Sequence, residues 1–227
     1  MNKFISEVTN EDCMEGMARY PDKYFDLAIV DPPYGIGMDE QKESYNKGKK
    51  GEGKRHRKQW CKKGWDDEIP NLKYFNELFR VSKNQIIWGG NYMTEFLKPS
   101  KCWIIWDKIQ EFTGSDFEMA WTSFNKSNKA FRMTRIEAYS NNNKINKDCG
   151  IKIHPTQKPV ALYKWLLNNY ANQGDKILDT HLGSGSSRIA AYEMGFDFTA
   201  FELDAEYFEA QEKRYKAHIA QLKLELV

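Results

Sequence analysis

Short apolar runs recur along the chain and are separated by polar or glycine-containing stretches. The runs are rich in β-branched and aromatic side chains, and they cover residues 25–30, 84–89, 102–106, 118–124, 176–180 and 198–203. Apolar runs of this length with polar or glycine residues at their ends are typical of buried strands. We therefore expect a sheet whose interior strands are these six runs.

Segments with helical spacing of apolar residues alternate with the runs. They cover residues 71–82, 159–171, 186–195 and 204–224. Gly195 is placed to end the third helix, and Asp204 is placed to cap the fourth. Strands that alternate with helices predict an α/β fold, with a largely parallel sheet covered by helices on both faces.

Two polar segments interrupt this alternation, and we expect both to be loops within a single domain that spans residues 1–227. Residues 38–66 contain a dense basic cluster, and residues 125–150 are rich in asparagine and moderately basic. A charged run is usually a solvated face. The cluster begins directly after the motif "DPPYGIG", and this position favours a contact with nucleic acid.

The bulk composition is that of an ordinary globular protein, with 41% hydrophobic residues in 227 and a net charge of +2. Any affinity for nucleic acid must therefore come from local clusters of charge. The four cysteines are scattered without a C-x-x-C pair, which argues against a metal site and against a disulfide framework. No apolar run is long enough to span a bilayer, and the expected location is the cytoplasm.

A glycine turn follows the apolar run 176–180, in the sequence "DTHLGSGSS". Gly183 and Gly185 would allow a tight turn and a close approach of a ligand to the following helix. Glu202 ends the next run, where an acid can accept hydrogen bonds from both hydroxyls of a ribose. The turn lacks the third glycine of a dinucleotide motif and has no G-K-[ST] for phosphates, so a nucleoside-containing cofactor is favoured.

The surroundings of this turn favour a cofactor without phosphate groups. Only Arg188 lies near the turn in sequence, whereas a polyphosphate would need more positive charge. S-adenosylmethionine fits better, because Asp179 could pair with its ammonium group. Its carboxylate could bind Thr156 and Lys158 in "HPTQKP", a motif that by itself would be read as a rigid proline-bounded turn.

The motif "DPPYGIG", residues 31–37, offers a way to activate an exocyclic amine of adenine or cytosine. Asp31 can accept a hydrogen bond from such an amine, and the carbonyl of Pro32 or Pro33, held rigid by the proline rings, can accept another. Tyr34 offers a flat face on which a base swung out of a duplex can stack. An Asp-Pro-Pro turn alone is common. Its combination with the glycine turn and Glu202 favours a reaction centre.

These motifs and their order resemble the beta group of DNA amino-methyltransferases, which methylate adenine N6 or cytosine N4 from S-adenosylmethionine. The resemblance extends over nearly the whole chain: "DPPYGIG" comes first, then the basic region, "HPTQKP", "DTHLGSGSS" and "FELDAEYF". It implies a three-layer Rossmann-like methyltransferase fold with circularly permuted motif order. The family sheet is mostly parallel, with seven strands of which one is antiparallel, and it binds the cofactor at the carboxyl ends of the strands.

The resemblance also assigns roles to residues of this chain. The catalytic tetrad would be Asp31, Pro32, Pro33 and Tyr34. The residues that it implies for cofactor binding are Asp12, Cys13, Thr156, Lys158, Asp179, His181, Gly183, Ser184, Gly185, Ser186 and Glu202. An acidic helix start would explain Asp12 equally well. The family usually has Pro-Phe where this chain has Thr180-His181, so a locally bonded core histidine is a comparable interpretation of His181.

We expect the chain to transfer a methyl group to adenine N6 in double-stranded DNA, directly and without a covalent enzyme intermediate. Cytosine-N4 methylation is the nearest alternative, but cytosine enzymes of the family more often carry Ser at the position of Asp31. RNA adenine methylation also remains open, and a non-catalytic DNA-binding subunit is disfavoured by the intact motifs. The expected contacts to DNA phosphates are Lys54, Arg55, Arg57 and Lys58.

Some properties stay open at this stage. The short segment 125–150 would read the target site, whose sequence the chain does not disclose. A homodimer is compatible with the resemblance. A restriction-modification system, a bacteriophage and a housekeeping circuit are all compatible origins.

Overall fold

A computed structural model describes residues 4–39, 61–109, 115–134, 137–138 and 152–225. The strands are β1 (Ser6–Thr9), β2 (Phe25–Val30), β3 (Ser82–Trp88), β4 (Trp103–Asp107), β5 (Phe117–Thr122), β6 (Lys129–Arg132), β7 (Lys176–Asp179) and β8 (Asp197–Phe201). The helices are α1 (Cys13–Ala18), α2 (Leu72–Val81), the short 3₁₀ helix η1 (Gly90–Tyr92), α4 (Val160–Tyr170), α5 (Ser186–Met194) and α6 (Ala205–Glu225).

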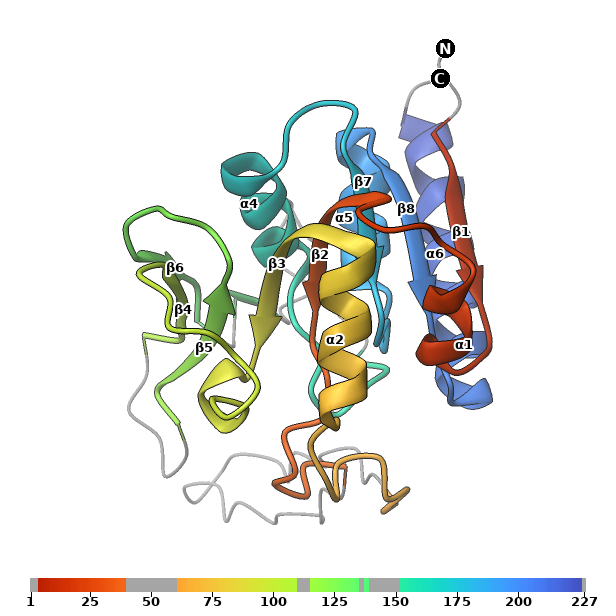
Figure 1. Cartoon of the computed structure of the whole chain (residues 1–227). Coiled ribbons are helices and arrows are strands. Elements are labelled where there is room, and N and C mark those ends of the chain that lie inside the picture. Colours follow the sequence, from red (N-terminus) through yellow and green to blue (C-terminus); the bar gives the residue numbers. More distant parts are fainter. Residues whose placement is uncertain (1–3, 40–60, 110–114, 135–136, 139–151, 226–227) are drawn as a thin grey trace, which may run out of the picture.

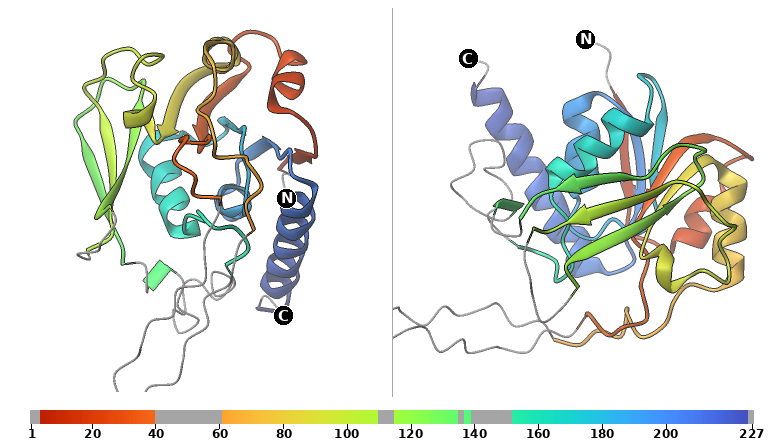
Figure 2. Two further views of the ribbon diagram at one scale, coloured as in Figure 1. Left: turned by 90° about the horizontal axis from the view of Figure 1, so that it is seen from below. Right: turned by 90° about the vertical axis from the view of Figure 1, so that its left-hand side faces the viewer.

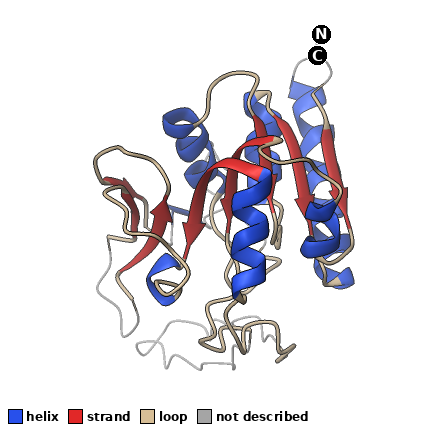
Figure 3. Cartoon of the chain, viewed as in Figure 1, coloured by secondary structure: helices blue, strands red, loops and turns tan. Residues whose placement is uncertain are grey.

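All of these strands belong to one sheet, in the order β1-β8-β7-β2-β3-β5-β4-β6 (Figure 3). Only β5 runs antiparallel to its neighbours among the described strands, as the resemblance implied. The described sheet has eight strands, one more than the seven implied. The six strands predicted from apolar runs are the interior ones. The two edge strands, β1 and β6, are short and largely polar, and they therefore lack an apolar run.

The molecule has three layers, with the sheet between two groups of helices (Figures 1 and 2). Helices α1 and α2 cover one face, and α4, α5 and α6 cover the other. Strand β2 shows why: Leu27 and Ile29 pack in the same core cluster as residues of α4 and α5, whereas Ala28 and Val30 pack with residues of α1 and α2. Alternate side chains of a central strand thus supply both cores.

The helix ends follow local rules that the sequence predicted. The Asp204 carboxylate accepts hydrogen bonds from the backbone N–H groups of Glu206 and Tyr207, at 2.9 and 3.1 Å. Gly195 ends α5 in a left-handed conformation with φ of 74°. Both predictions are confirmed. Helix α1 was expected only as the alternative interpretation of Asp12, because its six residues are too few to display helical periodicity.

The chain changes direction across the sheet between β2 and β7. These neighbours pair in parallel, with Leu27 opposite Ile177 and Ala28 opposite Leu178. From β2 the chain continues through α2 to β3 on one side, and from β7 it continues through α5 to β8 on the other. A crevice forms where such connections diverge at the carboxyl ends of parallel strands. Asp31 directly follows β2 and Asp179 ends β7, so both motifs lie at this crevice.

None of the helices among the described residues is both long and apolar enough to cross a membrane. Within the same residues, no group of three or more His, Cys, Asp or Glu side chains is arranged to hold a metal ion.

Candidate active site

A cavity of about 1290 Å³ opens at the carboxyl ends of the strands. All four residues of the expected catalytic tetrad line it, together with these residues expected to bind the cofactor: Asp12, Cys13, Thr156, Lys158, His181, Gly183, Ser184 and Glu202. Asp179, Gly185 and Ser186 are not among its lining residues. The two motifs, far apart in sequence, thus face one cavity. Lys54, Arg55, Arg57 and Lys58, which we expect to bind DNA, lie outside the described residues.

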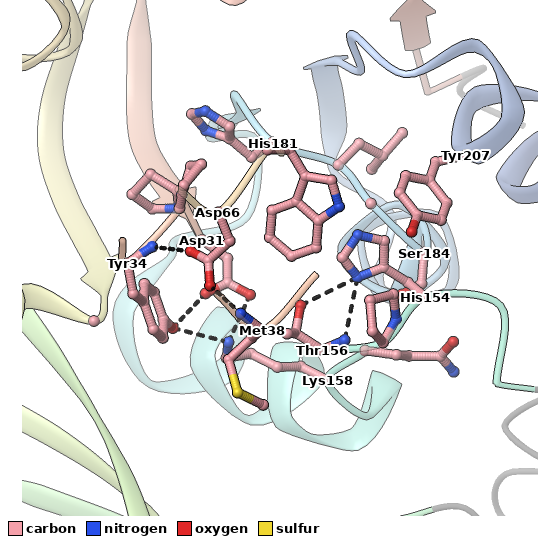
Figure 4. Close-up of a pocket in the computed structure, with 18 of the residues that line it drawn as sticks. Asp31, Tyr34, Met38, Asp66, His154, Thr156, Lys158, His181, Ser184 and Tyr207 are labelled. Carbon is pink, nitrogen blue, oxygen red and sulfur yellow. Dashed lines mark hydrogen bonds and ion pairs between the residues drawn. The ribbon is translucent and has the colours of Figure 1, made fainter. Parts of the chain in front are cut away.

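Two residues of the expected catalytic tetrad, Asp31 and Tyr34, form a compact hydrogen-bonded group with Lys158 (Figure 4). The Tyr34 hydroxyl donates to Oδ1 of Asp31 at 2.5 Å, and the Lys158 ammonium lies 2.5 Å from Oδ2. The Tyr34 ring stacks on Tyr92, with ring centroids 5.4 Å apart and planes at 19°. Tyr92 is 45% exposed, so the pair forms an aromatic wall that reaches from the cavity to its mouth.

Gly89, just after β3, makes room for Tyr34. Its φ is 69°, and a Cβ atom built there would lie 2.2 Å from the Tyr34 ring. Any side chain at this position would therefore displace the ring. The sequence offered no reason to connect these residues, because they lie on different loops.

Asp66 fixes the backbone of residues 31–39, which carry the expected tetrad and are called the catalytic loop below. Its buried carboxylate accepts hydrogen bonds from the backbone N–H groups of Tyr34, Gly35 and Met38, at 2.6, 3.0 and 2.7 Å. Asp39 in turn accepts hydrogen bonds from the backbone N–H groups of Lys63 and Gly64, at 3.0 and 2.5 Å. These crossed contacts join residues 34–39 to residues 63–66. Asp66 was not predicted to belong to the site, because no periodic pattern distinguishes it from its neighbour Asp67.

The glycine turn has the conformation that its sequence predicted. Gly183 and Gly185 have φ of 53° and 72°, in the left-handed region, and Gly185 directly precedes α5. The backbone N–H of Gly183 donates to Glu202 at 2.7 Å, and that of Asp204 donates to the same carboxylate at 2.9 Å. Burial raises the pKa of Glu202. A half-buried acid beside a glycine turn in the cavity wall suits the hydroxyls of a ribose.

Asp179 makes hydrogen bonds to residues on both sides of the glycine turn, including one at the start of α5. Its carboxylate accepts from the Ser187 hydroxyl at 2.6 Å and from the backbone N–H of His181 at 3.1 Å. Burial raises the pKa of Asp179 to about 7. Contact of this carboxylate with a cofactor ammonium therefore stays a prediction.

His181 lies in the cavity wall as a neutral ring. Its Nδ1 lies 2.9 Å from the Thr180 hydroxyl, and its ring meets the Tyr74 ring edge to face at 5.4 Å. Burial lowers the pKa of His181 to about 4. The imidazole can therefore offer an uncharged surface to an adenosine group, in place of the Phe that the family usually has.

Three further residues expected to contact the cofactor are Asp12, Cys13 and Thr156. The Asp12 carboxylate accepts from the backbone N–H of Met14 at 2.7 Å and so caps α1. Burial raises the pKa of Cys13 to about 12, which keeps the thiol protonated. The Thr156 hydroxyl lies 3.1 Å from Nδ1 of His154. Each of these residues lines the cavity, and their cofactor contacts stay predictions.

Glu118, on β5, is a charged cavity residue that was not predicted from the sequence. Its carboxylate lies 3.2 Å from the Lys158 ammonium and 3.0 Å from that of Lys108. A signal was present, because Glu118 begins the apolar run 118–124. A carboxylate in a strand expected to be buried requires a positive partner.

Comparison with solved structures identifies the fold. The structure of M1.HpyAVI in complex with SAM has a TM-score of 0.56 and 17% identity, and the match covers 92% of this chain and all of that one. The PvuII DNA methyltransferase, cytosine-N4-specific, has a TM-score of 0.60 and 13% identity, with 93% and 87% of the two chains covered.

Sequence relatives extend over most of the chain. The type II methyltransferase M.HinfI of Haemophilus influenzae is 24% identical, with 95% of this chain and 70% of that protein covered. The type II methyltransferase M2.MboI of Moraxella bovis is 22% identical, with 90% and 85% covered. A family model for N6/N4 methyltransferases, described as DNA methylase, matches residues 48–213. The chain therefore belongs to the N6/N4 amino-methyltransferase family of DNA methylases, whose cofactor is S-adenosylmethionine.

Proposed function

We propose that this DNA amino-methyltransferase acts on the N6 amine of adenine. The observation that carries the proposal is the position of Asp31, the first residue of the tetrad, in the same cavity as the glycine turn. Cytosine enzymes of the family more often carry Ser at this position. An aspartate offers a full negative charge to the protons of the amine.

The residues of the tetrad would have different roles in activating the amine. The Asp31 carboxylate accepts a hydrogen bond from the target amine, and a carbonyl of the proline pair accepts another. Together these acceptors localise the nitrogen lone pair. The bound cofactor supplies an electrophilic methyl group. The rigid prolines hold both acceptors before the substrate arrives, so little reorganisation is needed during transfer.

The target base would have to leave the duplex to reach Asp31, which is only 17% exposed. Tyr34 and its stacked neighbour Tyr92 supply aromatic surface between the cavity and solvent. Stacking on such surface offsets part of the cost of unstacking a base. We propose that the basic side chains Lys54, Arg55, Arg57 and Lys58 contact the DNA phosphates meanwhile.

The test is a direct identification of the methylated base. The purified protein is incubated with unmethylated genomic DNA and labelled S-adenosylmethionine, and the DNA is digested to nucleosides for mass spectrometry. We expect label in N6-methyladenine only. Label in N4-methylcytosine would assign the cytosine reaction. Normal cofactor binding with no label in this DNA, or in RNA incubated in the same way, would favour a non-catalytic binding subunit.

A further inference from the structure

Three acceptors in the cavity surround the ammonium group of Lys158. Its Nζ lies 2.5 Å from Oδ2 of Asp31, 3.2 Å from the Tyr34 hydroxyl and 3.2 Å from Oε2 of Glu118. An ammonium carries three hydrogens, and these acceptors account for all of them. The side chain is only 2% exposed. This arrangement leaves no N–H for the carboxylate of a cofactor, which is the role that the sequence suggested for Lys158.

The same contacts extend into a row of alternating charges across four elements. Lys108, after β4, pairs with Glu118 of β5, and Glu118 pairs with Lys158, which in turn pairs with Asp31 after β2. The formal charges of this row sum to zero. A buried ion requires such compensation, because removing a charge from water costs several kcal/mol or more. Lys158 is thus fixed from both sides and cannot swing away freely.

We propose that Lys158, held by Glu118, is a positioning residue that keeps the Asp31 carboxylate ionised and oriented towards the target amine. The inference rests on the proposed function, because only an amine-activating Asp31 must remain an acceptor. A protonated carboxyl group would present an O–H donor to an amine that is itself a donor. With Oδ2 tied to Lys158, the Asp31 side chain cannot rotate without losing a buried ion pair.

The electrostatic environment is consistent with this role. Burial raises the pKa of Asp31, and the ammonium of Lys158 opposes that effect. Burial acts to lower the pKa of Lys158, but Asp31 and Glu118 outweigh it and the pKa is raised. The ionisable groups that influence Asp31 from the surrounding elements are Lys158, Tyr34, Glu118, Asp179 and Tyr74.

The principal experiment compares Lys158→Met with the wild-type protein. Methyl transfer to DNA is measured in single turnover with cofactor and DNA saturating, from pH 5 to 9. We expect the rate at neutral pH to fall about tenfold and the acid limb of the profile to move up by about one pH unit or more. The cofactor Kd, measured by calorimetry, should stay within about threefold of wild type, because Lys158 does not bind the cofactor in this arrangement.

Two further variants test the sign of the effect. Glu118→Gln keeps a side-chain oxygen that can hold Lys158 but removes a negative charge that raises the pKa of Asp31, so its acid limb should move to lower pH. Lys158→Arg keeps the positive charge, so its acid limb should stay near that of wild type. The control is Lys83→Met, which removes the ion-pair partner of Asp26 at the amino ends of β2 and β3, away from the cavity. It should leave both the pH profile and the cofactor Kd unchanged.

A cofactor Kd weakened about tenfold in Lys158→Met, with an unmoved acid limb, would overturn the inference and make Lys158 a cofactor ligand. An NMR titration of the Asp31 carboxyl carbon in the free protein gives a readout that needs no DNA. Its midpoint should be higher in Lys158→Met than in wild type, and an unchanged midpoint would also overturn the inference. If the wild-type protein methylates no DNA, the proposed function fails, and this titration still decides the role of Lys158.

Discussion

Asp31 and the groups around it allow a direct test at the scale of single residues. We expect Asp31→Asn and Asp31→Ala to lower the single-turnover rate about a hundredfold or more, because each removes a charged acceptor aimed at the amine. Cofactor affinity should change little, since Asp31 is not among the residues expected to bind the cofactor. Rapid-quench measurement of methyl transfer, with calorimetry of cofactor binding, checks both. Unchanged turnover in Asp31→Asn would end the assignment of the tetrad.

Asp179 predicts a pH dependence of stability. Its folded-state pKa of about 7 exceeds the ordinary value of 3.8, so the folded protein holds a proton that the unfolded chain releases. The contribution of Asp179 to the free energy of unfolding is therefore favourable at low pH and is lost as pH rises towards 7. The loss is at most about 1.4 kcal/mol per pH unit.

The variant Asp179→Asn has no such titration. Its free energy of unfolding relative to wild type should increase between pH 5 and pH 8, because the wild-type protein alone bears the cost of a buried charge at the higher pH. Urea unfolding at the two pH values measures this difference. A difference between the two proteins that is equal at both pH values would show that Asp179 titrates normally in the folded protein.

At the scale of elements, the catalytic loop depends on a clamp from a distant segment. Asp66→Ala would leave the backbone N–H groups of Tyr34, Gly35 and Met38 without their acceptor. We expect a loss of about 2 kcal/mol or more in the free energy of unfolding, because the Asp66 residue that accepts these hydrogen bonds is buried. The single-turnover rate should also fall, with cofactor affinity largely retained.

The adjacent carboxylate provides the control for this prediction. Asp67 pairs with Lys62 at 2.7 Å on the surface, where both side chains are about half exposed. Asp67→Ala should therefore change stability and rate little, since exposed ion pairs contribute about 1 kcal/mol or less. Equal effects of the two substitutions would mean that Asp66 has no special hold on the loop.

The elements also show how far the sequence could lead. The interior strands and the long helices were predictable, because each buries a continuous apolar run or stripe. The two edge strands were not, because their side chains are largely polar and their pairing depends on β8 and β4 being in place. Among the site residues, Asp31 and Glu202 were identified by local motifs. Asp66 and Glu118 were not predicted, because their partners in the site are distant in sequence. Asp66 contacts the catalytic loop and Glu118 contacts Lys158, and each partner lies 28 or more residues away.

At the scale of the whole molecule, the site is a consequence of strand order. The tetrad and the glycine turn meet because β2 and β7 are parallel neighbours from which the chain departs in opposite directions. Neither motif predicts that these two strands are neighbours. It also leaves the basic segment after "DPPYGIG" beginning beside the cavity, since residues 34–39 and 63–66 are joined there.

The position of that segment predicts the salt dependence of DNA binding. Replacing Lys54, Arg55, Arg57 and Lys58 with Ala removes four positive charges, which takes the net charge from +2 to −2. If these side chains bind phosphates, the slope of log K against log salt should decrease in magnitude by about 0.9 for each phosphate that the variant no longer neutralises. Fluorescence anisotropy with a duplex at several salt concentrations measures the slope.

The control changes the net charge equally but at other places. Alanine at the exposed residues Lys83, Lys101, Lys213 and Lys216 also takes the charge from +2 to −2. Lys83 lies within the first residues of β3, and Lys101 lies shortly before β4. Both are therefore at the amino ends of these strands, away from the cavity. We expect this variant to keep the wild-type slope, because counterion release depends on local contact with phosphates rather than on total charge. If both variants flatten the slope equally, the basic segment is a solvated face and DNA is held elsewhere.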